Sequence, residues 1–162
     1  MAKMYLMCGI SGSGKTTFSK QFAAEHNIRR LGVDDYYAKV NGDECLHINF
    51  FDVWIEYFKA IHEAEMNNED VIIDTNALTQ GNREQFIEWF PTFEHHLIYI
   101  NCEFELCKRN NKSRKRQVPD KRMEEMFRTL EIPTIKTENS NWKSITWIIN
   151  TDNKFSNPIK YK

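Results

Sequence analysis

The sequence predicts an α/β fold in which a mostly parallel central sheet of about five strands is flanked by helices. Apolar runs of strand length alternate with stretches of helical periodicity along the 162 residues. A glycine-rich loop separates the first of these runs from the first helical stretch, and polar carboxylates follow two others. No repeat or Pro/Gly-rich linker divides the chain, so we expect one continuous domain over residues 1–162.

The expected strands are short apolar runs bounded by polar or turn residues. In chain order they are residues 3–8, 29–33, 71–74, 96–100 and 145–149. The second strand leads into Asp34 and Asp35, and the third ends in Asp74. Because the carboxyl ends of parallel strands meet at one edge of a sheet, we expect the ligand site at that edge.

The expected helices come from apolar residues that recur every three or four positions. In chain order they are residues 15–25, 36–40, 49–66, 82–90, 103–110 and 120–131, the second being only a turn of helix. Phe18 and Phe22 lie on one face of the first helix, and Phe50, Trp54 and Phe58 on one face of the third. Such aromatic stripes are typical of a buried helix face.

Composition and charge limit the class of protein. Lysine and arginine number 22 against 23 acidic residues, a net charge of -1, so any nucleic-acid-binding surface must be local. The four cysteines form neither a CxxC pair nor a zinc-like arrangement with histidines. No secretory leader and no apolar run of membrane-spanning length is apparent, so we expect a cytoplasmic protein with no membrane partner.

The loop GISGSGKTT follows the first strand and opens the first helix. It satisfies the phosphate-binding pattern GxxxxGK(S/T), in which backbone N–H groups and a helix N-terminus surround an anion. Lys15 is expected to contact the β- and γ-phosphates, and the Thr16 hydroxyl to bind Mg²⁺. The predicted nucleotide-binding residues are Gly9, Ser11, Gly12, Ser13, Gly14, Lys15, Thr16 and Thr17. The sequence therefore predicts a P-loop NTPase fold that binds ATP with Mg²⁺.

Five blocks extend this pattern into a resemblance. Residues 9–18, 33–36, 71–76, 108–112 and 118–119 resemble, in order and rough spacing, the kinase module of polynucleotide 5′-hydroxyl kinases. This implies a kinase used in nucleic acid repair that transfers the ATP γ-phosphate to 5′-hydroxyl ends of DNA or RNA. It also implies a lid at about residues 108–119. The chain lacks a DxDxT element, so no phosphatase is expected.

The resemblance assigns roles to two carboxylates. It implies that Asp34, rather than the adjacent Asp35, accepts the proton of the attacking hydroxyl, with Asp35 close to the substrate. The alternative is that Asp34 only caps a helix. Asp74 is expected either to bind Mg²⁺ through water or to organise the acceptor, and the sequence leaves both roles open.

The lid and the acceptor side depart from the family pattern. The family's lid arginine falls on Ser113, so Arg114, or else Arg116, is expected to replace it. Tyr37 stands where relatives often have an arginine that holds the acceptor's 3′-phosphate; its ring is expected either to stack on a base or to pack. Arg83 is expected to contact acceptor phosphate or to lie on a surface helix.

Two other functions remain open. A P-loop kinase of a small hydroxylated molecule, such as a nucleoside, sugar or antibiotic, would use Lys15, Thr16 and Asp34 in the same roles, and the near-neutral charge favours it. A nucleotide-switched binding protein would need no catalytic carboxylate. The sequence does not distinguish DNA from RNA and predicts no oligomeric state.

Overall fold

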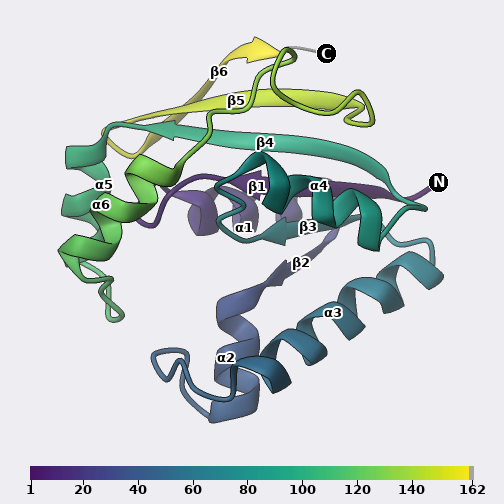
Figure 1. Cartoon of the computed structure of the whole chain (residues 1–162), viewed down its shortest axis with the longest axis horizontal. Coiled ribbons are helices and arrows are strands. Elements are labelled where there is room, and N and C mark those ends of the chain that lie inside the picture. The colour runs from purple at the N-terminus through teal and green to yellow at the C-terminus, as the bar shows by residue number, and fades with distance from the viewer. Residues whose placement is uncertain (161–162) are drawn as a thin grey trace.

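The computed structural model describes residues 1–160 as a six-stranded sheet with helices on both faces (Figure 1). The strands are β1 Lys3–Cys8, β2 Arg29–Gly32, β3 Val71–Asp74, β4 Glu94–Cys102, β5 Ser144–Thr151 and β6 Lys154–Lys160. The helices are α1 Lys15–His26, α2 Val33–Asn41, α3 Phe50–Met66, α4 Gln80–Trp89, α5 Phe104–Lys112 and α6 Asp120–Thr129. The predicted α/β class is confirmed.

The sheet has the order β2-β3-β1-β4-β5-β6. Neighbouring strands from β2 to β5 are parallel, and β6 runs antiparallel to β5. β1 lies between β3 and β4, so the loop that follows β1 leaves the middle of the sheet. In open parallel sheets the carboxyl edge at such a central strand is where ligands bind.

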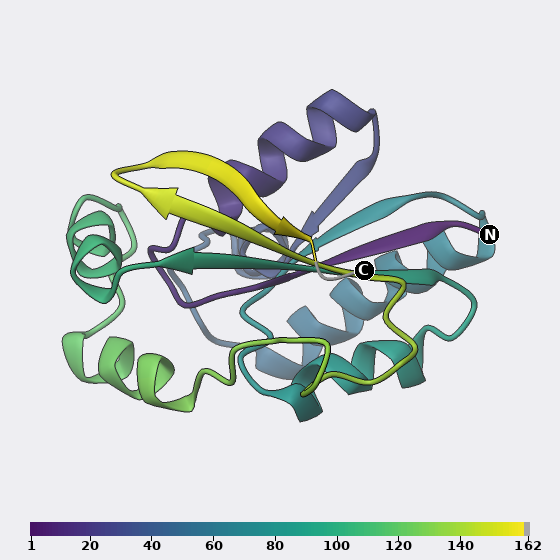
Figure 2. The same ribbon diagram turned by 90° about the horizontal axis from the view of Figure 1, so that it is seen from above.

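Side chains of β1 alternate between two cores because successive residues of a strand point to opposite faces. Met4, Leu6 and Cys8 join a core covered by α3 and α4, whereas Met7 joins a core covered by α1. Figure 2 shows α1 above the sheet and α3 and α4 below it. A third cluster holds α5 and α6 against the segment that follows β1.

The main error of the sequence-based fold is at its end. The sheet has six strands where about five were expected, because a hairpin adds β6 beside β5. Asp152 and Asn153 form its two-residue turn with positive φ values of 50° and 64°. Asn and Asp tolerate this conformation best after glycine, so the pair was the available signal for the hairpin.

The second strand also ends earlier than expected. β2 stops at Gly32, and α2 begins at Val33, so Asp34 and Asp35 lie in the first turn of a helix rather than at a strand end. Carboxylates are favourable in a first turn because the helix dipole is positive there. The change keeps both residues beside the carboxyl edge of the sheet. Among residues 1–160, no helix has the length and apolar character that crossing a bilayer requires.

Candidate active site

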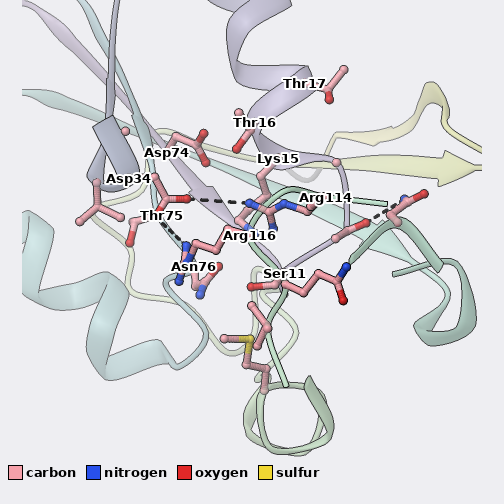
Figure 3. A pocket seen from close by; sticks show the side chains of 18 of the residues that line it. Ser11, Lys15, Thr16, Thr17, Asp34, Asp74, Thr75, Asn76, Arg114 and Arg116 are labelled. Atoms are coloured by element: carbon pink, nitrogen blue, oxygen red, sulfur yellow. Dashed lines mark hydrogen bonds and ion pairs between the residues drawn. The ribbon is translucent and has the colours of Figure 1, made fainter. Parts of the chain in front are cut away.

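A cleft of about 920 Å³ opens at the carboxyl edge of the sheet. Its walls come from the glycine-rich loop, the start of α2, the residues after β3 and the segment between α5 and α6 (Figure 3). The predicted site residues that line it are Ser11, Gly12, Gly14, Lys15, Thr16, Thr17, Asp34, Tyr37, Asp74 and Arg114. Gly9, Ser13, Asp35 and Arg83 are not among its lining residues. Most of the predicted site residues therefore line the same cleft.

The loop packs too closely for side chains at two of its glycines. Gly12 has a φ of 78°, and a Cβ there would lie 2.2 Å from the carbonyl oxygen of Cys107 on α5. Gly14 has a φ of 101°, and a Cβ there would lie 3.0 Å from Asn150 and from the ring of Phe155. The loop therefore needs glycine for its backbone conformation and for its contacts with α5 and the β5–β6 hairpin.

A Gly12→Ala substitution tests this packing. We expect it to destabilise the fold by about 1–3 kcal/mol more than Gly42→Ala, because the added methyl must push α5 away. Gly42 is the matched control: its φ is also 78°, but a Cβ there meets nothing within 4 Å. Urea unfolding of both variants measures the difference. Equal losses would mean that the cost lies in the backbone conformation alone.

Lys15 begins α1 and is almost fully buried at the base of the cleft. Its Nζ donates to the carbonyl oxygen of Ile10 at 2.8 Å. Burial lowers the pKa of Lys15, and the nearby Asp74 carboxylate partly opposes that shift. A desolvated ammonium interacts strongly with an anion, because water does not screen it.

The loop residues fit a bound polyphosphate. The Ser13 hydroxyl is buried and, among the residues that the structure describes, has no hydrogen-bond partner. Buried polar groups are normally paired, so this hydroxyl is an unused donor inside the loop, although Ser13 does not itself line the cleft. Together with the buried Lys15 ammonium and the helix N-terminus behind it, the loop has the donors that phosphate oxygens require.

The donors for Mg²⁺ lie around the same lysine. Figure 3 shows the Thr16 and Asp74 side chains near Lys15 in the cleft. Within residues 1–160 no group of three histidine, cysteine, aspartate or glutamate side chains could hold a metal. A hydroxyl with a carboxylate beside it suits Mg²⁺ that keeps waters and phosphate oxygens as its other ligands. The predicted role of Thr16 therefore fits the donor set.

Asp74 is held by an arginine that sequence reasoning missed. Its Oδ2 accepts hydrogen bonds from Arg30 Nη2 at 2.5 Å and from Ser19 Oγ at 3.1 Å. Arg30 also lines the cleft, and its Nη1 pairs with Asp35 at 2.6 Å. Asp35 is thus bound on the far side of Arg30 and largely exposed. Asp35 is not among the residues that line the cleft, and its contact with substrate stays a prediction.

Asp34 faces the cleft and is surrounded by cationic groups. Its Oδ1 accepts a hydrogen bond from Arg116 Nη1 at 2.9 Å, and its Oδ2 lies 3.9 Å from Arg114 Nη2. Both arginines belong to the segment between α5 and α6, which was expected to form a lid. The segment therefore brings its positive charges to the predicted proton acceptor, with Arg116 closer to it than Arg114.

Tyr37 lines the cleft together with a second residue, His47, that the sequence did not reveal. The Tyr37 side chain is buried, and the His47 ring stacks on it with centroids 3.8 Å apart and an interplanar angle of 9°. His47 also lines the cleft, with Nε2 4.0 Å from Asp34 Oδ1. His47 thus shares this part of the cleft wall with Tyr37. It comes from the loop between α2 and α3, which carries no motif.

Arg83 is not among the residues that line the cleft, and its contact with acceptor phosphate stays a prediction. The alternative, a surface position on a helix, is wrong, because Arg83 of α4 is fully buried. Its guanidinium is fully buried and pairs with the buried carboxylate of Glu138 through Nη2–Oε1 and Nε–Oε2. Its Nη1 donates to the carbonyl oxygens of Ala77 and Leu78. Arg83 instead ties the segment before β5 to the loop that precedes α4.

Comparison with known proteins identifies the family and the fold. A family model described as an AAA domain matches residues 4–133. The fold is similar to a gluconokinase from Sinorhizobium meliloti 1021, with 17% identity over 91% of this chain and 82% of that one and a TM-score of 0.62. A shikimate kinase from Bacteroides thetaiotaomicron is matched at 21% identity over 78% of this chain and 77% of that one, with a TM-score of 0.52.

A third similar structure is a chain of the Pnkp1/Rnl/Hen1 RNA repair complex. It matches at 20% identity with a TM-score of 0.70, over 80% of this chain but 44% of that one. The present chain thus corresponds to less than half of that relative. A search among curated proteins gave no match. The comparisons establish the P-loop kinase fold.

Proposed function

Because the chain belongs to the AAA domain family, we propose that it is an ATP-dependent kinase that transfers the γ-phosphate to a hydroxyl group. The observation that carries this proposal is the shared cleft. Lys15 lies at its base, Asp34 on its wall, and Arg114 and Arg116 beside Asp34. Phosphoryl transfer needs an ammonium that binds phosphate, a carboxylate that accepts the hydroxyl proton and positive charge near the transferred group.

Each side chain has a defined task in this reaction. Lys15 and the loop N–H groups hold the β- and γ-phosphates, and the Thr16 hydroxyl contributes to binding of Mg²⁺, which neutralises developing phosphate charge. Asp34 orients the acceptor hydroxyl and takes its proton. We infer that residues 108–119 close over the nucleotide and that Arg114 or Arg116 then turns from Asp34 to the phosphates. Catalysis rests mainly on positioning and charge stabilisation.

For the acceptor, we favour a small hydroxylated molecule. The gluconokinase and the shikimate kinase named above match over most of their own lengths. Tyr37 is buried beneath His47 where a phosphate-binding arginine would be expected for a polynucleotide end. The chain's net charge of -1 also gives no general attraction for nucleic acid.

A 5′-hydroxyl end of DNA or RNA is the second candidate. The five sequence blocks and the similarity to a chain of an RNA repair complex favour it. The stacked rings of Tyr37 and His47 beside Asp34 would also suit a base near the transfer point.

Transfer of labelled γ-phosphate from ATP tests both acceptors. The panel contains sugar acids, shikimate, free nucleosides and short 5′-hydroxyl DNA and RNA, with 5′-phosphorylated oligonucleotides as the control. Label on a small molecule supports the first acceptor, and label on oligonucleotides only when the 5′ end is free supports the second. ATP binding without transfer to any acceptor would count against a kinase.

An Asp34→Asn variant separates the carboxylate's role from nucleotide binding. We expect the transfer rate to fall by about 10²–10⁴-fold, because the amide cannot take the hydroxyl proton. ATP affinity should stay within about 3-fold of wild type. Asp35→Asn is the matched control and should retain activity, since Asp35 lies outside the cleft. Equal loss of ATP affinity and rate in Asp34→Asn would contradict the assignment.

A further inference from the structure

The loop between α2 and α3 places a histidine in the group that surrounds Asp34. His47 Nε2 is 4.0 Å from Asp34 Oδ1, and His47 Nδ1 is 3.4 Å from Arg116 Nη2. Arg116 Nη1 meanwhile donates to the same Asp34 oxygen at 2.9 Å. The three side chains form a closed triangle at the cleft wall, which we call the Asp34 triangle. No sequence motif predicts the contacts between these three side chains.

The chemistry of the triangle defines the state of the imidazole. Arginine has only donors, so Arg116 Nη2 can interact favourably with His47 Nδ1 only when that nitrogen carries no proton. In that tautomer His47 is neutral and its proton lies on Nε2. The ring then accepts from Arg116, and its N–H lies 4.0 Å from Asp34 Oδ1, beyond direct hydrogen-bond distance.

The ring is held in place from two sides. It stacks on the buried ring of Tyr37, a residue of α2. The Asn41 side chain, also in α2, donates to the carbonyl oxygens of Leu46 and Ile48, which flank His47 in the chain, at 2.7 and 2.9 Å. The backbone is thus hydrogen-bonded on both sides of His47, and the Tyr37 ring supports the imidazole beside Asp34.

We propose that His47 is a positioning residue for phosphate transfer, which holds Arg116 on Asp34 in the absence of nucleotide and keeps Asp34 directed at the acceptor hydroxyl once Arg116 moves to the phosphates. The inference rests on the proposed kinase function. It adds a residue that acts through Asp34. It also makes Asp34 available to the acceptor hydroxyl only after nucleotide binds, because Arg116 is hydrogen-bonded to the carboxylate until the nucleotide draws it to the phosphates.

The triangle also gives transfer a dependence on pH. Burial and the neighbouring Arg116 lower the pKa of His47, and Asp34 partly opposes them. The charged or titratable groups around the ring are Asp34, Tyr37 and Arg116, with Arg114 on the other oxygen of Asp34; Glu44 acts on the ring through its backbone. Below its pKa, His47 loses the Nδ1 acceptor, repels Arg116 and binds Asp34 as a cation. Asp34 then becomes a poorer proton acceptor, so transfer falls as the pH decreases through the pKa of His47.

Steady-state transfer between pH 5 and 8, with the acceptor identified by the panel, tests the inference in three variants. His47→Leu should lower kcat by about 10- to 100-fold with an unchanged KM for ATP, since a loosely held carboxylate aligns the hydroxyl poorly. His47→Gln should recover most of the rate, because its amide N–H replaces the Nε2 donor, but should lose the ionisation of His47. His62→Leu, which alters an exposed histidine of α3, should match wild type.

The role of His47 and the kinase activity are tested by different outcomes of this experiment. The expected pattern, with kcat restored by glutamine and an acid limb present only in wild type and His62→Leu, supports His47 as the positioning residue. Wild-type kinetics in His47→Leu, failure of glutamine to restore kcat, or an acid limb retained in His47→Gln would overturn the inference while leaving the kinase proposal intact. A wild-type protein that transfers phosphate to no acceptor would overturn both.

Discussion

Replacement of Lys15 by methionine is expected to lower the rate of phosphate transfer by on the order of 10³-fold or more, since it removes the cation that faces the β- and γ-phosphates. ATP affinity should fall as well, because Lys15 interacts with ground-state phosphates too. Calorimetric titration with ATP and a single-turnover transfer assay measure the two effects separately. No other single substitution in the cleft is expected to affect both so strongly.

The same variant should leave the nucleotide-free fold as stable as before, or more stable. The Lys15 ammonium is buried, and its pKa is lowered by desolvation, so its charge opposes folding until a phosphate pairs with it. Methionine keeps a chain of similar length without that charge. A thermal midpoint several degrees below wild type in the absence of nucleotide would show that Lys15 has a structural role.

The buried ion pair between Arg83 and Glu138 is expected to have a large effect on stability. Glu138→Gln is expected to lower the free energy of unfolding by about 3–5 kcal/mol, because it leaves the Arg83 guanidinium buried without its counter-ion. The short segment before β5 would then lose its attachment to the loop that precedes α4. Urea unfolding, fitted as a two-state transition with an unchanged slope, measures the loss.

Two controls identify the cause of that loss. Glu125→Gln breaks the exposed pair between Arg122 and Glu125 and should cost about 0–1 kcal/mol. The double variant Arg83→Met with Glu138→Leu removes both buried charges and should recover most of the stability. If the double variant were as unstable as Glu138→Gln, the loss would come from side-chain packing rather than from an unpaired charge.

The sequence was informative wherever a local pattern determines the structure. Short apolar runs predicted five strands, and helical spacing predicted the helices that cover them. The phosphate-binding loop was recognisable because glycine, lysine and threonine must occur at fixed spacing for backbone N–H groups to surround an anion. The cleft confirms that Lys15, Asp34, Asp74 and Arg114 lie together.

The missed features are pairs between distant parts of the chain. Arg30 lies 44 residues from Asp74, and Arg83 lies 55 residues from Glu138. His47 reaches Asp34 only because α2 reverses into the loop that carries it. The partners of such ion pairs have no required spacing along the chain. Only the fold shows whether a given arginine, such as Arg83, pairs with a carboxylate of the protein or is free to bind an acceptor.

The β5–β6 hairpin at the edge of the sheet supports the phosphate-binding loop. Asn150 Nδ2 donates to the carbonyl oxygen of Ser13 at 2.8 Å across 137 residues, and Phe155 lies against Gly14. A ribosome must therefore synthesise nearly the whole domain before the phosphate loop, one of the first segments to emerge, acquires its last support. Contacts of such long range slow folding. We expect ATP to assist the final step by binding the completed loop, so that the enzyme's donor also acts as a folding ligand.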